Sequence, residues 1–439
     1  MSIYNRAERI RDVIRYIKRF KNALMIIHFD EEIITSPFFS SHIRDISLIH
    51  QAGIRVAIIP GAKKRINTVL SDNQIPWKII NQTRITEENA MPLIKMAAFD
   101  VSNQVMTSLA GEGITAVIGN WVRARGMGVI QGIDFSTAGE IDKLATDAIK
   151  TVLDNGFIPI FPCIGWNSTG KPYNISSFHL ASEIAIHLQA EKLFYITPDA
   201  SLSQENCIIP ETIGLSPEKI IPSLNLAELE TLISVNKQHK KDNPLLNLLE
   251  LAKKSCQRGV TRVHLLNGTL EGTIPCEIFS DLGSGTMIYQ SNYGCIRSMK
   301  QEDIPHVLSL IRPFVEEGIL LPRSEELLLE TFHDYIVYEL DDGIRACAAF
   351  HQYDNQQGEI ACVAVDPTCT HMGIGPKIIS FLTSKAQEQG NKSVFVLTTK
   401  TADWFEKQGF IQDGIETLPN ERREKWNNGR NSKLYRKTF

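Results

Sequence analysis

The chain has 439 residues, of which 46 are basic and 50 acidic, so its formal net charge is −4. At about 150 residues per domain, this length predicts two or three domains. Hydrophobic residues make up 43% and charged residues 22%, which excludes a disordered, collagen-like or low-complexity chain. The pI of about 6.3 lacks the basic bias of nucleic-acid-binding proteins. We therefore expect a globular protein that binds neither DNA nor RNA.

Neither a membrane span nor a metal site is visible in the sequence. No uncharged apolar run approaches the roughly 18 residues of a membrane helix, and the longest uncharged stretch, 155–170, contains Pro159 and Pro162. The charged first residues do not form a signal peptide. The eight cysteines include no C-x-x-C pair, and no H-E-x-x-H motif occurs. We expect a cytoplasmic protein with reduced thiols, no membrane association and no metal cofactor.

The first predicted element is a basic amphipathic helix over residues 3–21. It could lie on a membrane surface, but its modest apolar stripe without Trp favours packing against another domain or subunit. Strand-like and helix-like stretches then alternate at 23–29, 40–52, 55–59, 62–70, 116–118, 158–163, 176–190 and 193–196. This alternation predicts an open α/β sheet with parallel strands and helices on both faces.

We place the main domain boundary near residues 289–294, where the order of the predicted helices and strands changes. Before that point we expect loops at 201–222, helices at 225–235 and 243–257, and strands at 262–266 and 286–288. After it we expect helices at 303–311, 375–389 and 401–408 and strands at 335–340, 344–353, 358–365, 393–398 and 432–437. The predicted organisation is an N-terminal helix over 1–22, an α/β domain over 23–290 and an α+β domain over 291–439.

One motif that suggests nucleotide binding is rejected. Residues 165–171 fit the P-loop spacing G-x-x-x-x-G-K, but Pro172 follows, which has no hydroxyl for magnesium and does not continue into the required helix. We expect a hairpin turn at this position.

The most informative segment is the strand 358–365 with the glycines that follow it. Gly373 and Gly375 stand at the start of a predicted helix. A strand that leads into glycines at a helix N-terminus exposes free backbone amides, which bind a pyrophosphate group. Coenzyme A carries such a group.

These residues resemble the GNAT acetyltransferases, whose pyrophosphate loop reads Q/R-x-x-G-x-G/A after a strand that ends in V-x-P. Val365-Asp366-Pro367 precedes the loop, Thr370 stands at the Q/R position, and W-F-x-x-x-G-F follows at 404–410. The threonine replaces one polar or cationic contact to phosphate by a hydroxyl. The resemblance implies that acetyl-CoA binds along Val363, Ala364, Val365, Thr370, His371, Met372, Gly373, Ile374, Gly375 and Pro376.

Residues 23–288 resemble the amino-acid kinase fold through 53–55, 60–62, Asn174 and 185–192. An amino-acid kinase fold followed by a GNAT domain resembles the bacterial N-acetylglutamate synthases. The resemblance implies acetyl transfer from acetyl-CoA to L-glutamate as the first step of arginine biosynthesis, feedback inhibition by L-arginine, and a homo-oligomer, a hexamer in relatives.

The kinase-like half departs from a working kinase. Asp30 and Glu31 stand where kinases have phosphate-binding glycines, and His28 replaces the usual lysine. Carboxylates at this position would repel ATP. Acetylglutamate kinase is therefore a disfavoured alternative. These departures, with Thr370, also motivate a third hypothesis, a non-catalytic arginine sensor with a decayed acetyltransferase domain.

Acetyl transfer to an amine requires a neutral amine, a polarised carbonyl and a proton for the departing thiolate. By resemblance, Glu359 is the general base, the backbone amides of Cys362 and Val363 polarise the carbonyl, and Thr398 protonates the thiolate. Glu359 could instead be an exposed strand carboxylate, and Thr398 a strand-forming residue.

Glutamate has two carboxylates, which favour guanidinium and hydroxyl partners. The resemblance assigns them to the side chains of Arg323, Arg430 and Ser432 and to the backbone of Leu321 and Cys362. Alternatively, Arg323 and Arg430 are solvated surface charges without a role in binding. The acceptor could also be another amino acid or amine instead of glutamate.

The resemblance also implies an arginine site between the N-terminal helix and the end of the kinase-like domain. Glu277 could pair with the guanidinium, and glycine amides could bind the carboxylate. The residues assigned to this site are Tyr16, His264, Glu277, Gly283, Gly285 and Thr286. Taken alone, His264 is more typical of a histidine in a protein core.

Overall fold

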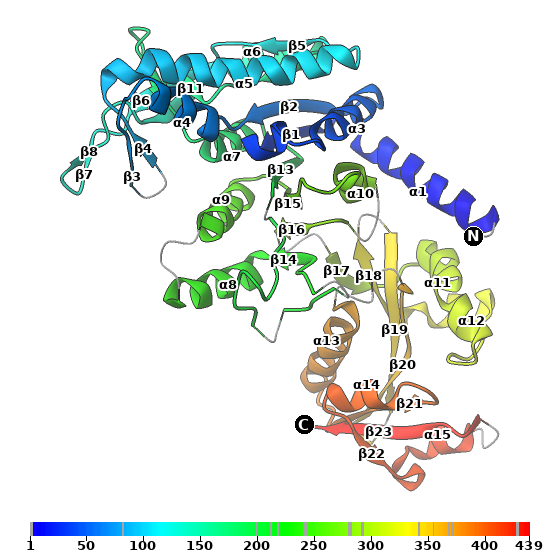
Figure 1. The fold of residues 1–439 in the computed structure, drawn as a ribbon. Coiled ribbons are helices and arrows are strands. Elements are labelled where there is room, and N and C mark those ends of the chain that lie inside the picture. Colours follow the sequence, from blue (N-terminus) through cyan, green and yellow to red (C-terminus); the bar gives the residue numbers. More distant parts are fainter. Residues whose placement is uncertain are drawn as a thin grey trace. The chain divides into compact units, whose positions relative to one another are not determined.

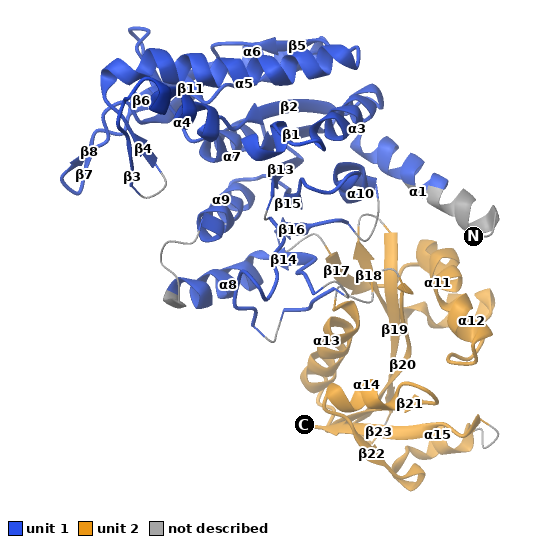
Figure 2. Ribbon diagram, viewed as in Figure 1, with its two compact units in different colours: residues 1–291 blue, residues 292–439 orange. Residues whose placement is uncertain are grey.

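The computed structural model describes residues 3–80, 83–198, 200–210, 213–216, 219–239, 244–279, 283–290, 294–340, 343–353, 355–367, 369, 373–426 and 430–439. The chain divides into two compact units, Met1–Ser291 and Asn292–Phe439 (Figure 2). Each unit is built around its own sheet. Within the described residues, no helix has the length and apolarity needed to cross a membrane.

The first unit contains an eight-stranded sheet in the order β14-β16-β15-β13-β1-β2-β10-β5. All neighbours run parallel except β15 and β16. The strands are β1 (Leu24–Phe29), β2 (Arg55–Pro60), β5 (Ala116–Ile118), β10 (Ile158–Ile160), β13 (Lys192–Thr197), β14 (Ser223–Asn225), β15 (Arg262–Asn267) and β16 (Thr286–Tyr289). The parallel α/β sheet predicted from the alternating pattern is confirmed.

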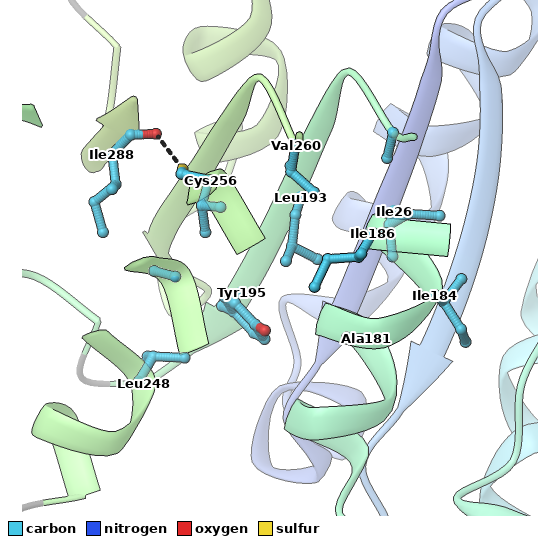
Figure 3. Packing of buried hydrophobic residues seen from close by; sticks show 14 of the residues in the cluster. Ile26, Ala181, Ile184, Ile186, Leu193, Tyr195, Leu248, Cys256, Val260 and Ile288 are labelled. Atoms are coloured by element: carbon cyan, nitrogen blue, oxygen red, sulfur yellow. Dashed lines mark hydrogen bonds between the residues drawn. The ribbon is translucent and has the colours of Figure 1, made fainter. Parts of the chain in front are cut away.

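Helices cover both faces of this sheet (Figure 1). Because successive strand residues point to opposite faces, Ile26 belongs to a core with Tyr195 and Cys256 (Figure 3), while Ile27 belongs to a second core. The helices are α1 (Ile3–Phe20), α2 (Glu31–Ile34), α3 (Phe39–Gln51), α4 (Lys63–Asp72), α5 (Met91–Gly111), α6 (Thr146–Asp154), α7 (Ser177–His187), α8 (Leu226–His239), α9 (Pro244–Gln257) and α10 (Thr273–Phe279). The sequence pattern does not predict α5, whose buried stripe includes the small residues Ala97, Ala98 and Ser102.

A smaller sheet in the order β12-β11-β6-β9 and two hairpins complete the first unit. Its strands are β3 (Lys78–Ile80), β4 (Thr83–Ile85), β6 (Val122–Gly126), β7 (Val129–Ile130), β8 (Ile133–Asp134), β9 (Gly139–Leu144), β11 (Ile164–Trp166) and β12 (Pro172–Asn174). Trp166 pairs with Pro172 across an antiparallel hairpin. The segment with P-loop spacing is therefore a hairpin turn, as predicted.

The second unit has a seven-stranded sheet in the order β17-β18-β19-β20-β21-β23-β22, in which only β20 and β21 are parallel. Its strands are β17 (Gly294–Ser298), β18 (Tyr335–Leu340), β19 (Gly343–Tyr353), β20 (Gln357–Val365), β21 (Ser393–Thr398), β22 (Ile411–Asp413) and β23 (Lys433–Thr438). Its helices are α11 (Ile304–Glu316), α12 (Glu325–Thr331), α13 (Ile374–Glu388), α14 (Ala402–Lys407) and α15 (Asn420–Glu424). The predicted α+β character is confirmed.

Two cores lie on opposite faces of this second sheet. Ile336 packs with residues of α13, and its neighbour Val337 packs with residues of α11. Short 3₁₀ helices occur at Glu88–Ala90, Gln301–Asp303, Phe332–Asp334 and Ile415–Thr417. The two cores fix β20 between its covering helices, and β20 carries Glu359 and the predicted residues from Cys362 to Val365.

Candidate active site

The two parallel strands of the second unit separate after a short contact. β20 and β21 pair only from Gln357 opposite Ser393 to Glu359 opposite Phe395, whereas β21 pairs with β23 along its whole length. No described strand pairs with residues 360–365 on this side of β20. Their backbone groups can therefore hydrogen-bond to an extended ligand, as an added strand would.

A bulge interrupts β20 at this open edge. The pairing with β19 shifts between Cys347 and Ala349, and Cys362 has a φ of 51°. Bulges redirect the backbone and are frequent next to active sites. Here the bulge sets the direction of the amides of Cys362 and Val363, which the sequence assigned to the acetyl carbonyl.

The open edge of β20 leads along the chain to the N-terminus of α13. Gly373 is the N-cap residue with a φ of 65°, and it supplies no side-chain hydrogen bond. No described residue accepts a hydrogen bond from the amides of Ile374 and Gly375. Free amides and the helix dipole together favour an anion. Thr370, His371 and Met372 lie outside the described residues.

Pro376 and Gly375 of the predicted pyrophosphate loop each have a structural property that limits or explains their role. Pro376 has no N–H, so it cannot donate to phosphate, and the prediction of an amide contact there is wrong. Gly375 permits close packing, because a Cβ atom at this position would lie 2.9 Å from the Trp404 ring. Trp404 is thus part of the wall behind the loop.

Glu359 is a buried carboxylate with one oxygen held in place. Its side chain is 5% exposed. Its Oε2 atom accepts hydrogen bonds from the Tyr353 hydroxyl at 2.9 Å and from Arg422 Nε at 2.8 Å. Among the described residues, none donates a hydrogen bond to Oε1. The alternative of an exposed strand carboxylate is therefore wrong, and Oε1 is available for a proton.

Thr398 lies at the end of β21, and its hydroxyl already has partners. Its Oγ1 atom accepts from the backbone N–H of Thr401 at 3.0 Å and lies 2.7 Å from the Thr401 hydroxyl. The interaction joins β21 to the start of α14. Donation to a thiolate requires that the Thr401 hydroxyl be the donor in this pair, which leaves the Thr398 proton free.

The two predicted glutamate-binding arginines are held by backbone carbonyls. Arg323 donates from Nη1 to the Leu321 carbonyl at 3.0 Å and from Nε to the Tyr335 hydroxyl at 2.5 Å. Arg430 donates from Nη2 to the Ile319 carbonyl at 2.5 Å. Burial and the charge of Arg323 both lower the pKa of Arg430. Two mutually repelling guanidinium groups favour an anion between them.

Leu321 and Ser432 stand beside these arginines in the chain. Leu321 is 48% exposed, and its carbonyl already accepts from Arg323. Ser432 is partly buried immediately before β23. Both arginines are only partly exposed, so a fully solvated surface charge describes neither of them.

Five of the six residues predicted for an arginine site gather at one place in the first unit. Glu277 on α10 accepts from His264 Nδ1 at 2.6 Å through Oε1 and from the N–H groups of Ser284 and Gly285 at 2.6 and 3.1 Å through Oε2. A Cβ at Gly283 would lie 2.7 Å from that Oε2. Thr286 donates to the Ile221 carbonyl at 2.6 Å.

Tyr16 reaches the same region through α1, which contacts α10. Burial lowers the pKa of His264 to about 4, against the effect of its bond to Glu277. The bond to His264 helps to keep the pKa of Glu277 below its usual range, although burial acts in the opposite direction. A neutral imidazole therefore faces an ionised carboxylate. Both oxygens of Glu277 are engaged by the protein itself in this conformation.

The kinase-like phosphate region is filled by the protein's own carboxylates. Glu31 accepts from the N–H groups of Lys64 and Arg65 at 2.6 and 2.7 Å, which closes the N-terminus of α4. Asp30 caps α2 by accepting from the Glu32 N–H at 2.9 Å. Burial lowers the pKa of His28 to about 3, so this residue is neutral.

Sequence reasoning missed Tyr353, Arg422 and Tyr335. Arg422 lies in the charged run 421–424, which reads as a solvated helix face. No local pattern signals its bond to Glu359, 63 residues away. No group of His, Cys, Asp and Glu suited to a metal ion occurs within the described residues.

Comparisons with known proteins agree with this geometry. Residues 24–267 match the amino acid kinase family, and residues 331–412 match the acetyltransferase (GNAT) domain. The chain is 32% identical to the amino-acid acetyltransferase of Pasteurella multocida (strain Pm70) over 95% of this chain and 94% of that protein. It is 30% identical to that of Pseudomonas fluorescens (strain Pf0-1) over 98% of both.

Among solved structures, N-acetylglutamate synthase from Neisseria gonorrhoeae complexed with coenzyme A and L-arginine matches with a TM-score of 0.81, 29% identity and full coverage of both chains. The same enzyme with coenzyme A and N-acetyl-glutamate matches at 0.62 and 30% identity over 100% of this chain and 99% of that one. The resemblance found in the sequence is confirmed. The chain belongs to the amino-acid acetyltransferase family and is an acyltransferase that combines an amino-acid kinase fold with a GNAT domain.

Proposed function

We propose that this protein transfers the acetyl group of acetyl-CoA to the amino group of L-glutamate, giving N-acetyl-L-glutamate and coenzyme A. The observation that carries the proposal is the pair Arg323 and Arg430, two partly buried guanidinium groups close enough for one charge to affect the other. A dicarboxylic amino acid supplies the anionic groups that such a pair lacks. Neutral amines and basic amino acids do not.

Acetyl-CoA is expected along the open edge of β20, with its pyrophosphate at the amides of Ile374 and Gly375. Among the described strands none pairs with residues 360–365 on that side, and Gly373 gives α13 no side-chain cap. The backbone amides at the Cys362 bulge are the proposed donors to the acetyl carbonyl. Coenzyme A bound in the relatives from Neisseria gonorrhoeae supports this position.

Glu359 is the proposed general base. Arg422 and Tyr353 fix Oε2, so Oε1 is the atom that accepts the ammonium proton, directly or through a water. The neutral amine then attacks the thioester carbonyl, and the C–S bond breaks as the tetrahedral intermediate collapses. Thr398 is the proposed donor to the coenzyme A thiolate, because its hydroxyl ends β21.

L-Arginine is the proposed effector, bound in the first unit at the cluster around Glu277. Arginine in the solved relative supports this assignment. A guanidinium that binds Glu277 competes with the donors that Glu277 now has, which are His264, the Ser284 and Gly285 N–H groups and the Ser284 hydroxyl. Exchange of the Ser284 or Gly285 bonds would couple arginine binding to a rearrangement of residues 283–286, which is a route to feedback inhibition.

We further propose that the protein acts in the cytoplasm as a homo-oligomer assembled through α1, and that its working domains are 1–22, 23–290 and 291–439. Ile10, Val13 and Ile14 are 60%, 37% and 48% exposed on this helix. An apolar stripe of this kind is typical of a subunit contact.

Coenzyme A release from acetyl-CoA tests the function, with glutamate, aspartate, ornithine or arginine as acceptor. We expect release with glutamate and suppression of this release by added arginine. Equal rates with ornithine would contradict the role of the arginine pair. A folded protein that binds arginine but releases no thiol with any acceptor would support the sensor hypothesis instead.

A further inference from the structure

A short segment over residues 317–323 joins α11 to α12, and three cationic side chains hold it. Each of them donates a hydrogen bond to one backbone carbonyl of the segment. Two of the donors extend from neighbouring strands, because Lys400 comes just after β21 and Arg430 just before β23. The donor and acceptor residues are Lys400 and Glu317 at 2.9 Å, Arg430 and Ile319 at 2.5 Å, and Arg323 and Leu321 at 3.0 Å. Contacts at alternate residues thus fix the segment to one end of the sheet.

Tyr335 on β18 fixes the third donor, Arg323. The Arg323 Nε atom donates to the Tyr335 hydroxyl at 2.5 Å. Because a guanidinium group is planar, this contact and the one from Nη1 to the Leu321 carbonyl set its orientation. Among the described residues, none accepts a hydrogen bond from Arg323 Nη2. Nη2 is therefore the group left for a ligand.

The Tyr335 ring also connects Arg323 to the bulge of β20. Its side chain is 2% exposed and lies in the same core as Cys362, the residue at the bulge. Packed cores do not deform continuously. The distance between the Arg323 guanidinium and the backbone amide of Cys362 is therefore set by a buried ring and one hydrogen bond.

We propose that Tyr335 and Lys400 are positioning residues that determine which dicarboxylic amino acid the site accepts. This inference rests on the proposed function, in which the amides at Cys362 hold the acetyl carbonyl and Arg323 and Arg430 bind the carboxylates. The acceptor must then place its amine at the acetyl group and its carboxylates at the arginines. Aspartate is one methylene group shorter than glutamate, so it spans the same distance only if Arg323 moves. Because a misplacement of about 1 Å costs roughly 10²-fold in rate, a fixed Arg323 selects the longer acceptor.

The experiment compares kcat/KM for L-glutamate and L-aspartate in the full-length protein and its variants. Tyr335→Phe keeps the ring and releases Arg323 Nε. We expect the KM for glutamate to rise about tenfold and that for aspartate to change little, so the glutamate-to-aspartate ratio of kcat/KM falls about tenfold. The KM for acetyl-CoA should stay unchanged. Tyr338→Phe is the matched control and should keep the wild-type ratio, because Tyr338 is a buried tyrosine of the same strand that packs in the opposite core.

Lys400→Met removes a contact of the segment at an exposed position, so it tests the inference even if Tyr335→Phe fails to fold. We expect the same ratio to fall about threefold and Lys400→Arg to restore it. Loss of positive charge alone would raise the KM for both acceptors equally and leave the ratio unchanged. Lys437→Met is the control, because Lys437 also donates to a backbone carbonyl at 2.9 Å, that of Gln408 outside the segment.

A wild-type ratio in either variant would overturn the role of that residue, as would a parallel loss with both acceptors. Calorimetric binding of N-acetylglutamate and N-acetylaspartate in the presence of coenzyme A separates this result from the proposed function. A wild-type protein that releases no thiol with any acceptor would overturn the proposed function. If that protein prefers N-acetylglutamate and Tyr335→Phe reduces the preference, the inference holds for binding. Equal binding of the two compounds would overturn the inference as well.

Discussion

The N-termini of α4 and α13 both present backbone N–H groups that can bind an anion. Among the described residues, those of α4 have an acceptor and those of α13 have none. At α4, Glu31 accepts from the amides of Lys64 and Arg65 through its two oxygens. At α13, the amides of Ile374 and Gly375 have no acceptor among the described residues. In the kinase-like unit the protein supplies its own anion, whereas at α13 we propose that the pyrophosphate of coenzyme A takes the corresponding position. The difference would explain why the proposed activity resides in the second unit.

Two of the three buried glutamates in the described part of the chain, Glu31 and Glu359, differ in the same way. Both oxygens of Glu31 are bound to backbone, so its carboxylate serves the fold. For Glu359, the donors among the described residues reach Oε2 alone, and we propose that Oε1 exchanges the proton.

The largest effect is expected for Glu359→Gln, which keeps the shape of the side chain but removes the base. We expect kcat to fall by about 10²–10⁴-fold, the usual contribution of a general base, with little change in the KM for acetyl-CoA. Steady-state kinetics with glutamate as acceptor measures this effect. Retention of wild-type kcat would contradict the assignment of Glu359.

Arg430→Ala is expected to act on glutamate binding. Loss of one charge-assisted interaction of about 1.5–3 kcal/mol corresponds to a KM for glutamate raised by roughly 10–100-fold. The KM for acetyl-CoA should stay unchanged. Arg423→Ala is a matched control on the same unit, because among the described residues Arg423 donates to the backbone carbonyls of Glu416 and Leu418. Equal kinetic effects of the two substitutions would contradict a specific role for Arg430.

Glu31→Gln tests whether the Glu31 carboxylate stabilises the N-terminus of α4. The amide keeps one acceptor oxygen but loses the charge that faces the α4 dipole, so we expect the free energy of unfolding to fall by about 1–3 kcal/mol. Urea unfolding of the whole protein measures the change. The specific activity of the folded protein should stay at the wild-type value, in contrast to Glu359→Gln. Unchanged stability would show that Glu31 does not hold α4 in place.

The sequence predicted most strands of the eight-stranded sheet, because parallel strands buried on both faces leave continuous apolar runs. It missed α5 and most of the smaller sheet of the first unit. It also located Glu359, Arg323 and Arg430 through the family resemblance. It could not predict that Arg422 and Tyr353 hold Glu359, since this contact joins residues 63 apart through a surface-like charged segment. Nor could it predict that Glu31 closes α4. Charge repulsion predicted that Asp30 and Glu31 disfavour ATP, but the hydrogen bonds to Lys64 and Arg65 depend on how the chain folds.

Gly373→Asp tests the proposed pyrophosphate site at the N-terminus of α13. It places a carboxylate next to the N–H groups there, as Glu31 is placed at α4. Aspartate tolerates the left-handed conformation of Gly373 better than most residues, and its carboxylate would compete with pyrophosphate for the same amides. We expect the KM for acetyl-CoA to rise by about tenfold. Gly373→Asn is the neutral control and should have the smaller effect. Equal effects of the two variants would indicate backbone strain rather than competition for the anion site.

The smallest effect is expected for Tyr353→Phe, which removes one of the two donors to Glu359 Oε2. The ring should keep its contact with Phe395, 6.0 Å away between centroids. Loss of one hydrogen bond of about 1 kcal/mol should lower kcat by roughly fivefold and leave both KM values unchanged.

A double-mutant cycle distinguishes positioning of Glu359 from a general structural role of Tyr353. If the hydroxyl acts by positioning the Glu359 carboxylate, Tyr353→Phe should have no further effect on kcat in the Glu359→Gln background, since the base is already absent. Arg422→Lys should retain more activity than Arg422→Gln, because the ammonium group preserves the charge next to Oε2. Additive losses in the cycle, together with equal activities of the two Arg422 variants, would mean that Oε2 is bound for the stability of the sheet. In that case Glu359, like Glu31, would be held for the fold rather than for proton transfer.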